Sequence, residues 1–173
     1  MTVPMADHEV RVERVADPGH EHVAALARLL PQLSSSAPTP DRSTLDHLCD
    51  PAGSARLFAA RLASTGATPP GPRRPGDTPP GEGPLVGFAL LLVFSTLTGT
   101  RGLVEDVVVD EAARNHGVGT SLVEHLVRAA RDEGCRTLDL TSRPSREAAN
   151  RLYARCGFVR RDTNVWRHPL DPR

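Results

Sequence analysis

Residues 104–133 read VEDVVVDEAARNHGVGTSLVEHLVRAARDE and predict a strand, a glycine loop and a long helix. The β-branched run Val107, Val108 and Val109 suits a buried strand. Behind the loop, apolar residues recur at helical spacing, namely Leu122, Val123, Leu126, Val127 and Ala130. Gly134 stands where a glycine that ends a helix belongs. A strand that leads directly into an amphipathic helix implies a fold of mixed helices and sheet.

The loop between this strand and helix has the features of a phosphate seat. The first turns of a helix leave backbone N–H groups without partners, and the helix dipole makes that end mildly positive. Gly117 and Gly119 lack the β-carbons that would keep a ligand away, and Arg114 adds positive charge. Asn115 tolerates left-handed backbone. The pattern favours phosphate binding, although taken alone it fits a glycine turn that binds nothing equally well.

Two common phosphate motifs do not fit this loop. A P-loop requires Gly-Lys-Ser/Thr, whereas Gly119 is followed by Thr120 and Ser121. The dinucleotide fingerprint requires a third glycine, which is absent. What remains is Arg114-x-x-Gly117-x-Gly119, which resembles the coenzyme-A-binding loop of the GNAT superfamily of N-acetyltransferases.

A second motif carries the same resemblance. The segment Asn150-x-x-Tyr153-x-x-Cys156-Gly157-Phe158 is similar to the second GNAT signature. Asn150 and Tyr153 are one helical turn apart and share a face. The two motifs stand in family order and at family spacing, whereas the N-terminal third of the chain matches only in the order of its elements.

The resemblance implies an α+β fold, a central mixed sheet of about seven strands flanked by four helices, with the fourth and fifth strands splayed apart. Periodicity predicts strands over residues 9–15, 55–62, 85–96, 103–109, 137–141, 157–159 and 165–167. Besides the helix behind the loop, it predicts helices over residues 18–30 with Pro31 ending the helix, over 41–50 with Asp41 or Ser43 as the cap, and over 145–156.

The length of the chain favours a single domain over residues 1–173. One segment departs from this plan, because residues 64–84 read STGATPPGPRRPGDTPPGEGP. Such a composition buries too little apolar surface to offset the entropy lost on ordering. We expect a disordered insertion in a hairpin loop, since the strand that follows still needs a partner.

Composition excludes several function classes. The chain carries no net charge at pH 7, and aromatic residues make up 3% of it, which argues against nucleic acid as a partner. No apolar run reaches the length of a membrane span, and no signal segment is visible. Three widely spaced cysteines fit a reducing compartment, so we expect a cytoplasmic protein. The seven histidines show no spacing typical of metal ligands.

The resemblance implies acetyl-coenzyme A as co-substrate and no metal. Its pantetheine arm would run along the backbone of Val107, Val108 and Val109. Its pyrophosphate would rest on the amides of Arg114, Asn115, His116, Gly117, Val118, Gly119 and Thr120, and Asn150 would contribute from the second motif. Asn115 stands where family members often have glycine.

Acetyl transfer requires a neutral amine, and deprotonating a lysine-like amine of pKa about 10.4 at pH 7 costs ~4–5 kcal/mol. A base is therefore useful, and Glu105 is the candidate, against a solvated strand-end carboxylate. Asp106 would face the other way in a regular strand, and a bulge would reverse this. Tyr153 is the candidate acid for the thiolate of coenzyme A, against simple core packing. Cys156 has no histidine nearby in sequence and is expected to be structural.

Three functions remain open at this point: an N-acetyltransferase acting by direct attack in a ternary complex, a non-catalytic acyl-coenzyme-A module, and a phosphate module for another nucleotide. The acceptor is expected among residues 31–42 and 160–165, and a small-molecule amine is favoured over a protein N-terminus or lysine. A homodimer through the sheet edge or the C-terminal strands is a further expectation.

Overall fold

The computed structural model describes residues 8–36, 38–64 and 83–170. Its strands are β1 His8–Arg14, β2 Ala55–Ser64, β3 Leu85–Thr96, β4 Gly99–Val109 and β5 Leu138–Leu140. Its helices are α1 His20–Leu33, α2 Arg42–Leu48, α3 Val118–Asp132 and α4 Glu147–Arg155, with a short 3-10 helix, η1, over Glu111–Ala113. Most of the expected insertion, residues 65–82, lies outside the described residues.

The strands form one sheet in the order β1-β2-β3-β4-β5. The first four strands pair antiparallel in succession, and β5 pairs parallel to β4. The parallel pairing is short, because it joins only Gly102, Leu103 and Val104 to Leu138, Asp139 and Leu140. From Glu105 onward, β4 has no strand partner on this side among the described residues.

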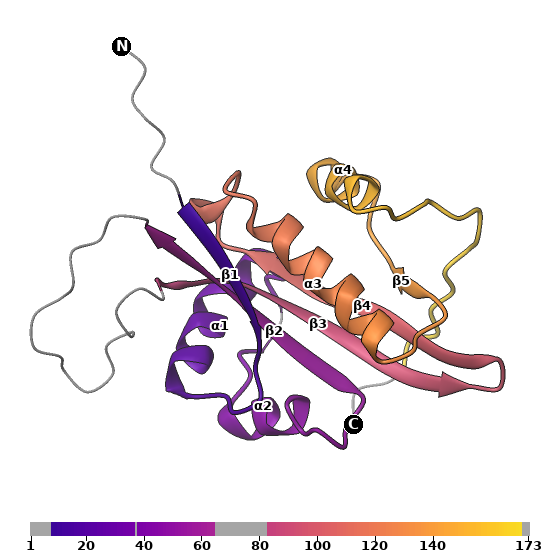
Figure 1. The fold of residues 1–173 in the computed structure, drawn as a ribbon, viewed down its shortest axis with the longest axis horizontal. Helices are drawn as coiled ribbons and strands as arrows, with labels where there is room; N and C mark the ends of the chain where they lie inside the picture. The colour runs from indigo at the N-terminus through magenta and orange to yellow at the C-terminus, as the bar shows by residue number, and fades with distance from the viewer. Residues whose placement is uncertain (1–7, 37, 65–82, 171–173) are drawn as a thin grey trace, which may run out of the picture.

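Helices cover both faces of the sheet (Figure 1). Alternate residues of β2 supply the two cores, as expected for a strand whose side chains point to opposite faces. Leu57 and Ala59 pack in one cluster with the apolar residues of α1 and α2. Phe58 and Ala60 pack in the other cluster with those of α3. Because the sheet is covered on both faces, its functional groups must lie at its ends or edges.

The helix boundaries confirm most of the sequence-based assignments. Asp41 is the N-cap of α2, and its carboxylate accepts a hydrogen bond from the amide of Thr44 at 2.8 Å. Gly134 has φ 72° directly after α3, and its amide bonds to the carbonyl of Arg131 at 2.9 Å. Pro31 was expected to end α1, and this prediction is wrong, because the helix runs to Leu33. Pro31 stands in the last turn of α1, so the missing N–H removes one hydrogen bond near the end of the helix and only two residues follow it.

The expectation of about seven strands is not confirmed, because the described residues form five. Residues 159–170 have no regular secondary structure. Their large apolar side chains are exposed, namely Val159, Val165, Trp166 and Leu170. A strand exists only where a neighbouring edge accepts its hydrogen bonds, and no such ladder forms along this segment. We call residues 159–170 the C-terminal arm.

Candidate active site

A β-bulge interrupts β4 at the point where the site is expected. Leu90 of β3 faces Glu105, whereas Phe88 faces Val108, so Asp106 and Val107 together oppose a single β3 residue. Asp106 has φ 51°, a left-handed value that is uncommon for a residue other than glycine. A bulge leaves its extra residue out of the ladder and is a frequent feature next to active sites.

The bulge changes which face the β4 side chains occupy. Val104 packs in the cluster under α3, and Val108 packs in the cluster under α1, although both positions would share a face in a regular strand. Val107 and Val109 contact the α3 cluster. Glu105 precedes the bulge and therefore points away from Val104, to the face covered by α1 and α2. The bulge lies after Glu105, so it changes the faces of the residues that follow and leaves the face of Glu105 as in a regular strand.

Glu105 sits in an environment suited to a base. Burial raises the pKa of its carboxyl group, the neighbouring Asp106 raises it further, and the positive charge of Arg167 acts in the opposite direction. A raised carboxyl pKa makes the ionised group a stronger base at neutral pH. Arg167 belongs to the C-terminal arm, so the arm brings a positive charge to the same region.

The start of α3 presents unpaired backbone N–H groups. Gly117 is its N-cap with φ 80°, and no side chain caps the helix. The first hydrogen bond of the helix runs from the amide of Ser121 to the carbonyl of Gly117 at 2.9 Å. The amides of Val118, Gly119 and Thr120 precede it and have no carbonyl within the helix to bind. A β-carbon added at Gly117 would meet nothing within 4 Å, so this surface is open to a ligand.

Gly119 also has a packing role that the sequence did not indicate. A β-carbon at this position would lie 2.8 Å from Cδ1 of Leu152 and 3.7 Å from Cγ2 of Val109. The missing side chain therefore lets α4 pack closely against the first turn of α3. The role of Gly119 is to bring the helix that carries Tyr153 next to the phosphate loop.

The side chains of the phosphate loop are engaged locally. Arg114 forms an exposed ion pair with Glu111 at 3.3 Å. His116 places its Nδ1 2.9 Å from the carbonyl oxygen of Arg114. Asn115 has φ 68°, as its tolerance of left-handed backbone predicts. The loop therefore presents mainly backbone to a ligand.

The end of α4 explains the spacing of the second motif. Gly157 has φ 88°, and its amide bonds to the carbonyl of Ala154 at 3.1 Å. The amide of Phe158 bonds to the carbonyl of Tyr153 at 3.0 Å. This pair of bonds is a Schellman motif, which brings together the two side chains at its ends. The rings of Tyr153 and Phe158 meet edge to face, with centroids 6.0 Å apart.

Tyr153 is protonated at neutral pH. Burial raises the pKa of its phenol, and the charge of Arg146 acts in the opposite direction. Asn150, one turn earlier, donates from its side-chain amide to the carbonyls of Arg143 at 3.1 Å and Pro144 at 3.4 Å. Asn150 therefore orders the turn before α4.

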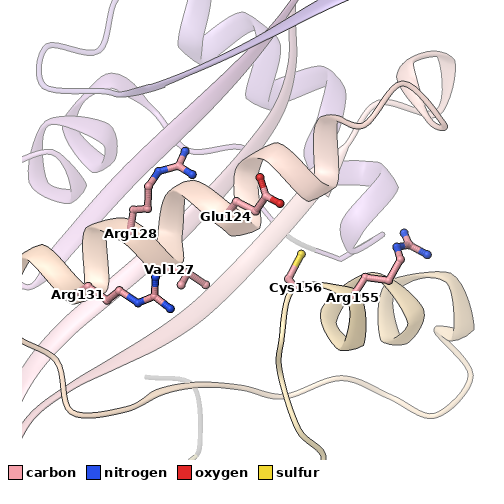
Figure 2. A pocket seen from close by; sticks show the side chains of 6 residues that line it. All are labelled: Glu124, Val127, Arg128, Arg131, Arg155 and Cys156. Atoms are coloured by element: carbon pink, nitrogen blue, oxygen red, sulfur yellow. The ribbon is translucent and has the colours of Figure 1, made fainter.

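A cleft of about 240 Å³ separates α3 from the end of α4. It is lined by Glu124, Val127, Arg128, Arg131, Arg155 and Cys156. Figure 2 shows that the three guanidinium groups point in different directions and that Cys156 faces α3. Burial raises the pKa of the Cys156 thiol, and Glu124 raises it further. A thiol with a raised pKa is a poor nucleophile at neutral pH, which supports a structural role for Cys156.

The expected site residues come from three consecutive parts of the chain. Glu105 lies on β4, just beyond the residues that pair with β5, the glycine loop follows the end of β4, and Tyr153 lies on α4. No group of three or more histidine, cysteine or acidic residues in the described ranges is arranged to hold a metal ion. No helix among the described residues is long and apolar enough to cross a membrane.

Some residues at this site could not be found from the sequence. Arg28 and Gln32 of α1 contact the start of the phosphate loop, and Arg146 and Arg167 act on Tyr153 and Glu105. None of these four belongs to a motif. Phe158 did stand in a motif, but its contact with Tyr153 follows from the geometry of a helix end.

Comparison with known proteins agrees with this geometry. Residues 76–158 match the family model described as the acetyltransferase (GNAT) family. A probable glucosamine 6-phosphate N-acetyltransferase of Oryza sativa subsp. japonica is 46% identical over 67 residues, which are 39% of either chain. An N-alpha-acetyltransferase of Arabidopsis thaliana is 33% identical over 60 residues, which are 35% of this chain and 32% of that protein. The chain thus spans about two fifths of the length of the rice relative and about one third of the Arabidopsis one.

A solved structure shows the same fold over nearly the whole chain. An aminoglycoside N-acetyltransferase in complex with coenzyme A superposes with a TM-score of 0.67 at 16% identity, covering 97% of this chain and 99% of that one. The strand, the loop and the two helices described above all lie within the matched residues. Over residues 76–158, just under half of its length, this chain matches the acetyltransferase (GNAT) family.

Proposed function

We propose that this protein transfers an acetyl group from acetyl-coenzyme A to a primary amine, by direct attack in a ternary complex. The observation that carries the proposal is the bulged end of β4, which lacks a strand partner on the β5 side among the described residues and leads through a short loop to a helix start without a side-chain cap. The match of residues 76–158 to the GNAT acetyltransferase family, and the coenzyme A complex of the aminoglycoside enzyme, support the choice of cofactor.

The cofactor is proposed to occupy the separation between β4 and β5. Its pyrophosphate would accept hydrogen bonds from the amides at the start of α3, where the helix dipole favours negative charge. Its pantetheine arm would run along the backbone of Val107 to Val109, which no strand covers on this side among the described residues. The thioester would then lie between Glu105 and Tyr153.

The chemistry requires two protons to leave the acceptor nitrogen and one proton to reach the leaving sulfur. Glu105 accepts a proton from the ammonium group of the acceptor, directly or through water, and the neutral nitrogen bonds to the thioester carbonyl carbon. A backbone N–H near Val107 or Val108, at the interruption in the ladder, stabilises the oxyanion. The carbon–sulfur bond then breaks, Tyr153 gives its proton to the leaving sulfur, and the newly bonded nitrogen loses its second proton to water. Solvent then reprotonates the phenolate of Tyr153 and takes the first proton from Glu105.

We propose a small-molecule amine as the acceptor. The rice relative is named for glucosamine 6-phosphate, and the solved structure is of an aminoglycoside acetyltransferase. Both names describe amines on sugars. The Arabidopsis relative is named an N-alpha-acetyltransferase, so a protein N-terminus is the second candidate acceptor. A homodimer remains part of the proposal and would be measured by light scattering.

The test has two stages. Calorimetry with coenzyme A and with ATP should show binding of coenzyme A and much weaker binding of ATP. Release of free thiol from acetyl-coenzyme A is then followed over a panel of amino sugars, aminoglycosides, amino acids and N-terminal peptides. Turnover with an amino sugar is expected. Binding of coenzyme A without turnover on any amine would leave a non-catalytic acyl-coenzyme-A module, and preferred binding of ATP would overturn the proposal.

A further inference from the structure

The last two turns of α1 are tied to the start of the phosphate loop. The guanidinium of Arg28 forms an ion pair with the carboxylate of Asp110, the residue that follows β4. A second nitrogen of Arg28 donates to the carbonyl of Leu85 in β3 at 2.8 Å. One turn later, Gln32 accepts a hydrogen bond from the backbone amide of Glu111 at 2.9 Å. Arg28 and Gln32 are four residues apart and share one face of the helix.

These contacts reach a segment with few other anchors. Asp110 is held to β3 through its amide, which bonds to the carbonyl of Val86 at 2.8 Å, and its carboxylate caps η1 at Ala112. Beyond η1, the loop passes through two left-handed residues, Asn115 and Gly117, before α3 begins. Among the described residues, the side chain of Arg114 pairs with Glu111, inside the same segment. Ala113 of η1 is buried in the cluster under α3. The first part of the loop is therefore held by β3, by the burial of η1 and by α1.

The same helix end also reaches α4. The carbonyl of Leu33, the last residue of α1, accepts a hydrogen bond from Arg146 at 3.2 Å. Arg146 is the N-cap residue of α4, the helix that carries Tyr153. One short segment of α1 thus contacts both the element expected to bind the cofactor phosphates and the element expected to supply the acid.

We infer that Arg28 and Gln32 are positioning residues that hold the phosphate loop in the conformation that binds coenzyme A. The inference rests on the proposed function and extends it to a part of the chain without any motif. A loop that is already ordered loses less conformational entropy when its ligand binds. Removing the anchor should therefore weaken cofactor binding, while the chemical step at saturating cofactor stays nearly unchanged.

Arg28→Met is the main variant, because methionine keeps much of the apolar stem and loses both polar contacts. The dissociation constant for coenzyme A, measured by calorimetry on the full chain, is expected to rise by roughly tenfold. Gln32→Ala removes one hydrogen bond from a backbone amide and is expected to raise the dissociation constant for coenzyme A by about threefold. Arg28→Lys keeps the charge without the fork and should lie between Arg28→Met and the unmodified protein.

Arg42→Met is the matched control. Arg42 lies on α2, its side chain is 49% exposed against 47% for Arg28, and it pairs with Asp17 and Asp46. Its loss should leave the affinity for coenzyme A within about twofold. Equal affinities in Arg28→Met, Gln32→Ala and the unmodified protein would overturn the inference, as would an equal loss in the control.

Hydrogen exchange separates this inference from the proposed function. Amides of residues 110–120 should exchange faster in Arg28→Met and Gln32→Ala, and should be unaffected in Arg42→Met. This readout needs no ligand. If the unmodified protein fails to bind coenzyme A, the proposed function fails, whereas unchanged exchange in both α1 variants would sink the positioning role alone. Melting temperatures identify any variant that is unfolded, and Gln32→Ala provides the milder test.

Discussion

Helices α3 and α4 and the C-terminal arm all contain apolar residues, but only the residues of the helices are packed. Leu122, Val123 and Leu126 of α3 are 0% exposed, whereas Trp166 of the arm is 89% exposed. The helices close their own hydrogen bonds, and each ends at a glycine that satisfies its last carbonyls. The arm would have to find a partner edge to do the same. Local bonding therefore lets a segment form before its neighbours do, whereas a strand depends on its neighbours.

The candidate site takes residues from both regions. The glycine loop leads into α3, and Tyr153 lies on α4, so their backbone is held by helix ends. Arg167 belongs to the C-terminal arm, and its positive charge lowers the pKa of Glu105. The following four changes test whether the reaction depends on the region from β4 to α4 far more than on the C-terminal arm.

Tyr153→Phe should have the largest effect. Removal of the phenolic proton donor is expected to lower kcat by about 10³-fold, within the usual range for a general acid. The affinity for coenzyme A should change little, because the ring and its contact with Phe158 remain. Steady-state kinetics with calorimetry measure the two quantities. Full activity in this variant would show that solvent protonates the thiolate.

Glu105→Gln is expected to lower kcat/KM by about 10²-fold and to change its pH dependence. In the unmodified enzyme, activity should rise with pH as Glu105 loses its proton. The midpoint should lie above the usual range of a glutamate because burial raises its pKa. The glutamine variant should lack this acidic limb. Asp106→Asn, on the exposed bulge, is the control, and an equal effect there would assign the base to Asp106.

Gly119→Ala should destabilise the fold rather than remove the chemistry. The new methyl group would stand 2.8 Å from Cδ1 of Leu152, so α3 and α4 must move apart or Leu152 must change rotamer. A cost of about 1 kcal/mol is expected, seen as a fall in Tm of roughly 2–4 °C. Leu152→Ala in the same chain should recover part of the loss. Additive losses in the double variant would show that the two positions are not in contact.

Trp166→Ser should have the smallest effect. Its ring is exposed, so the free energy of unfolding should change by less than about 0.5 kcal/mol. Affinity for coenzyme A should also be unchanged. Thermal melts and light scattering check this outcome. A fall in Tm of several degrees, or a change in mass, would show that the arm is packed in solution and would remove the contrast drawn above.

The fold of the region from β4 to α4 could be predicted because the sequence patterns that specify it are local. The valine run of β4, Gly117, the apolar stripe of α3 and Gly134 each specify a backbone conformation within a few residues. Pro31 was misread because proline removes one helix hydrogen bond, and this loss falls in the last turn of α1, where the helix continues for only two more residues. The predicted sixth and seventh strands are not confirmed, because alternating apolar residues favour a strand but do not provide the neighbouring strand that it must pair with.

The amino-acid sequence by itself determined the resemblance over residues 76–158, the glycine loop and the helix that bears Tyr153, because turns, caps and helical stripes depend on neighbouring residues. Only the tertiary structure decided that β4 is bulged, that Gly119 makes room for Leu152, and that Arg28 and Gln32 reach the loop. These features join residues far apart in the chain. Their geometry depends on which strands pair and how closely helices approach, and no short stretch of sequence encodes either.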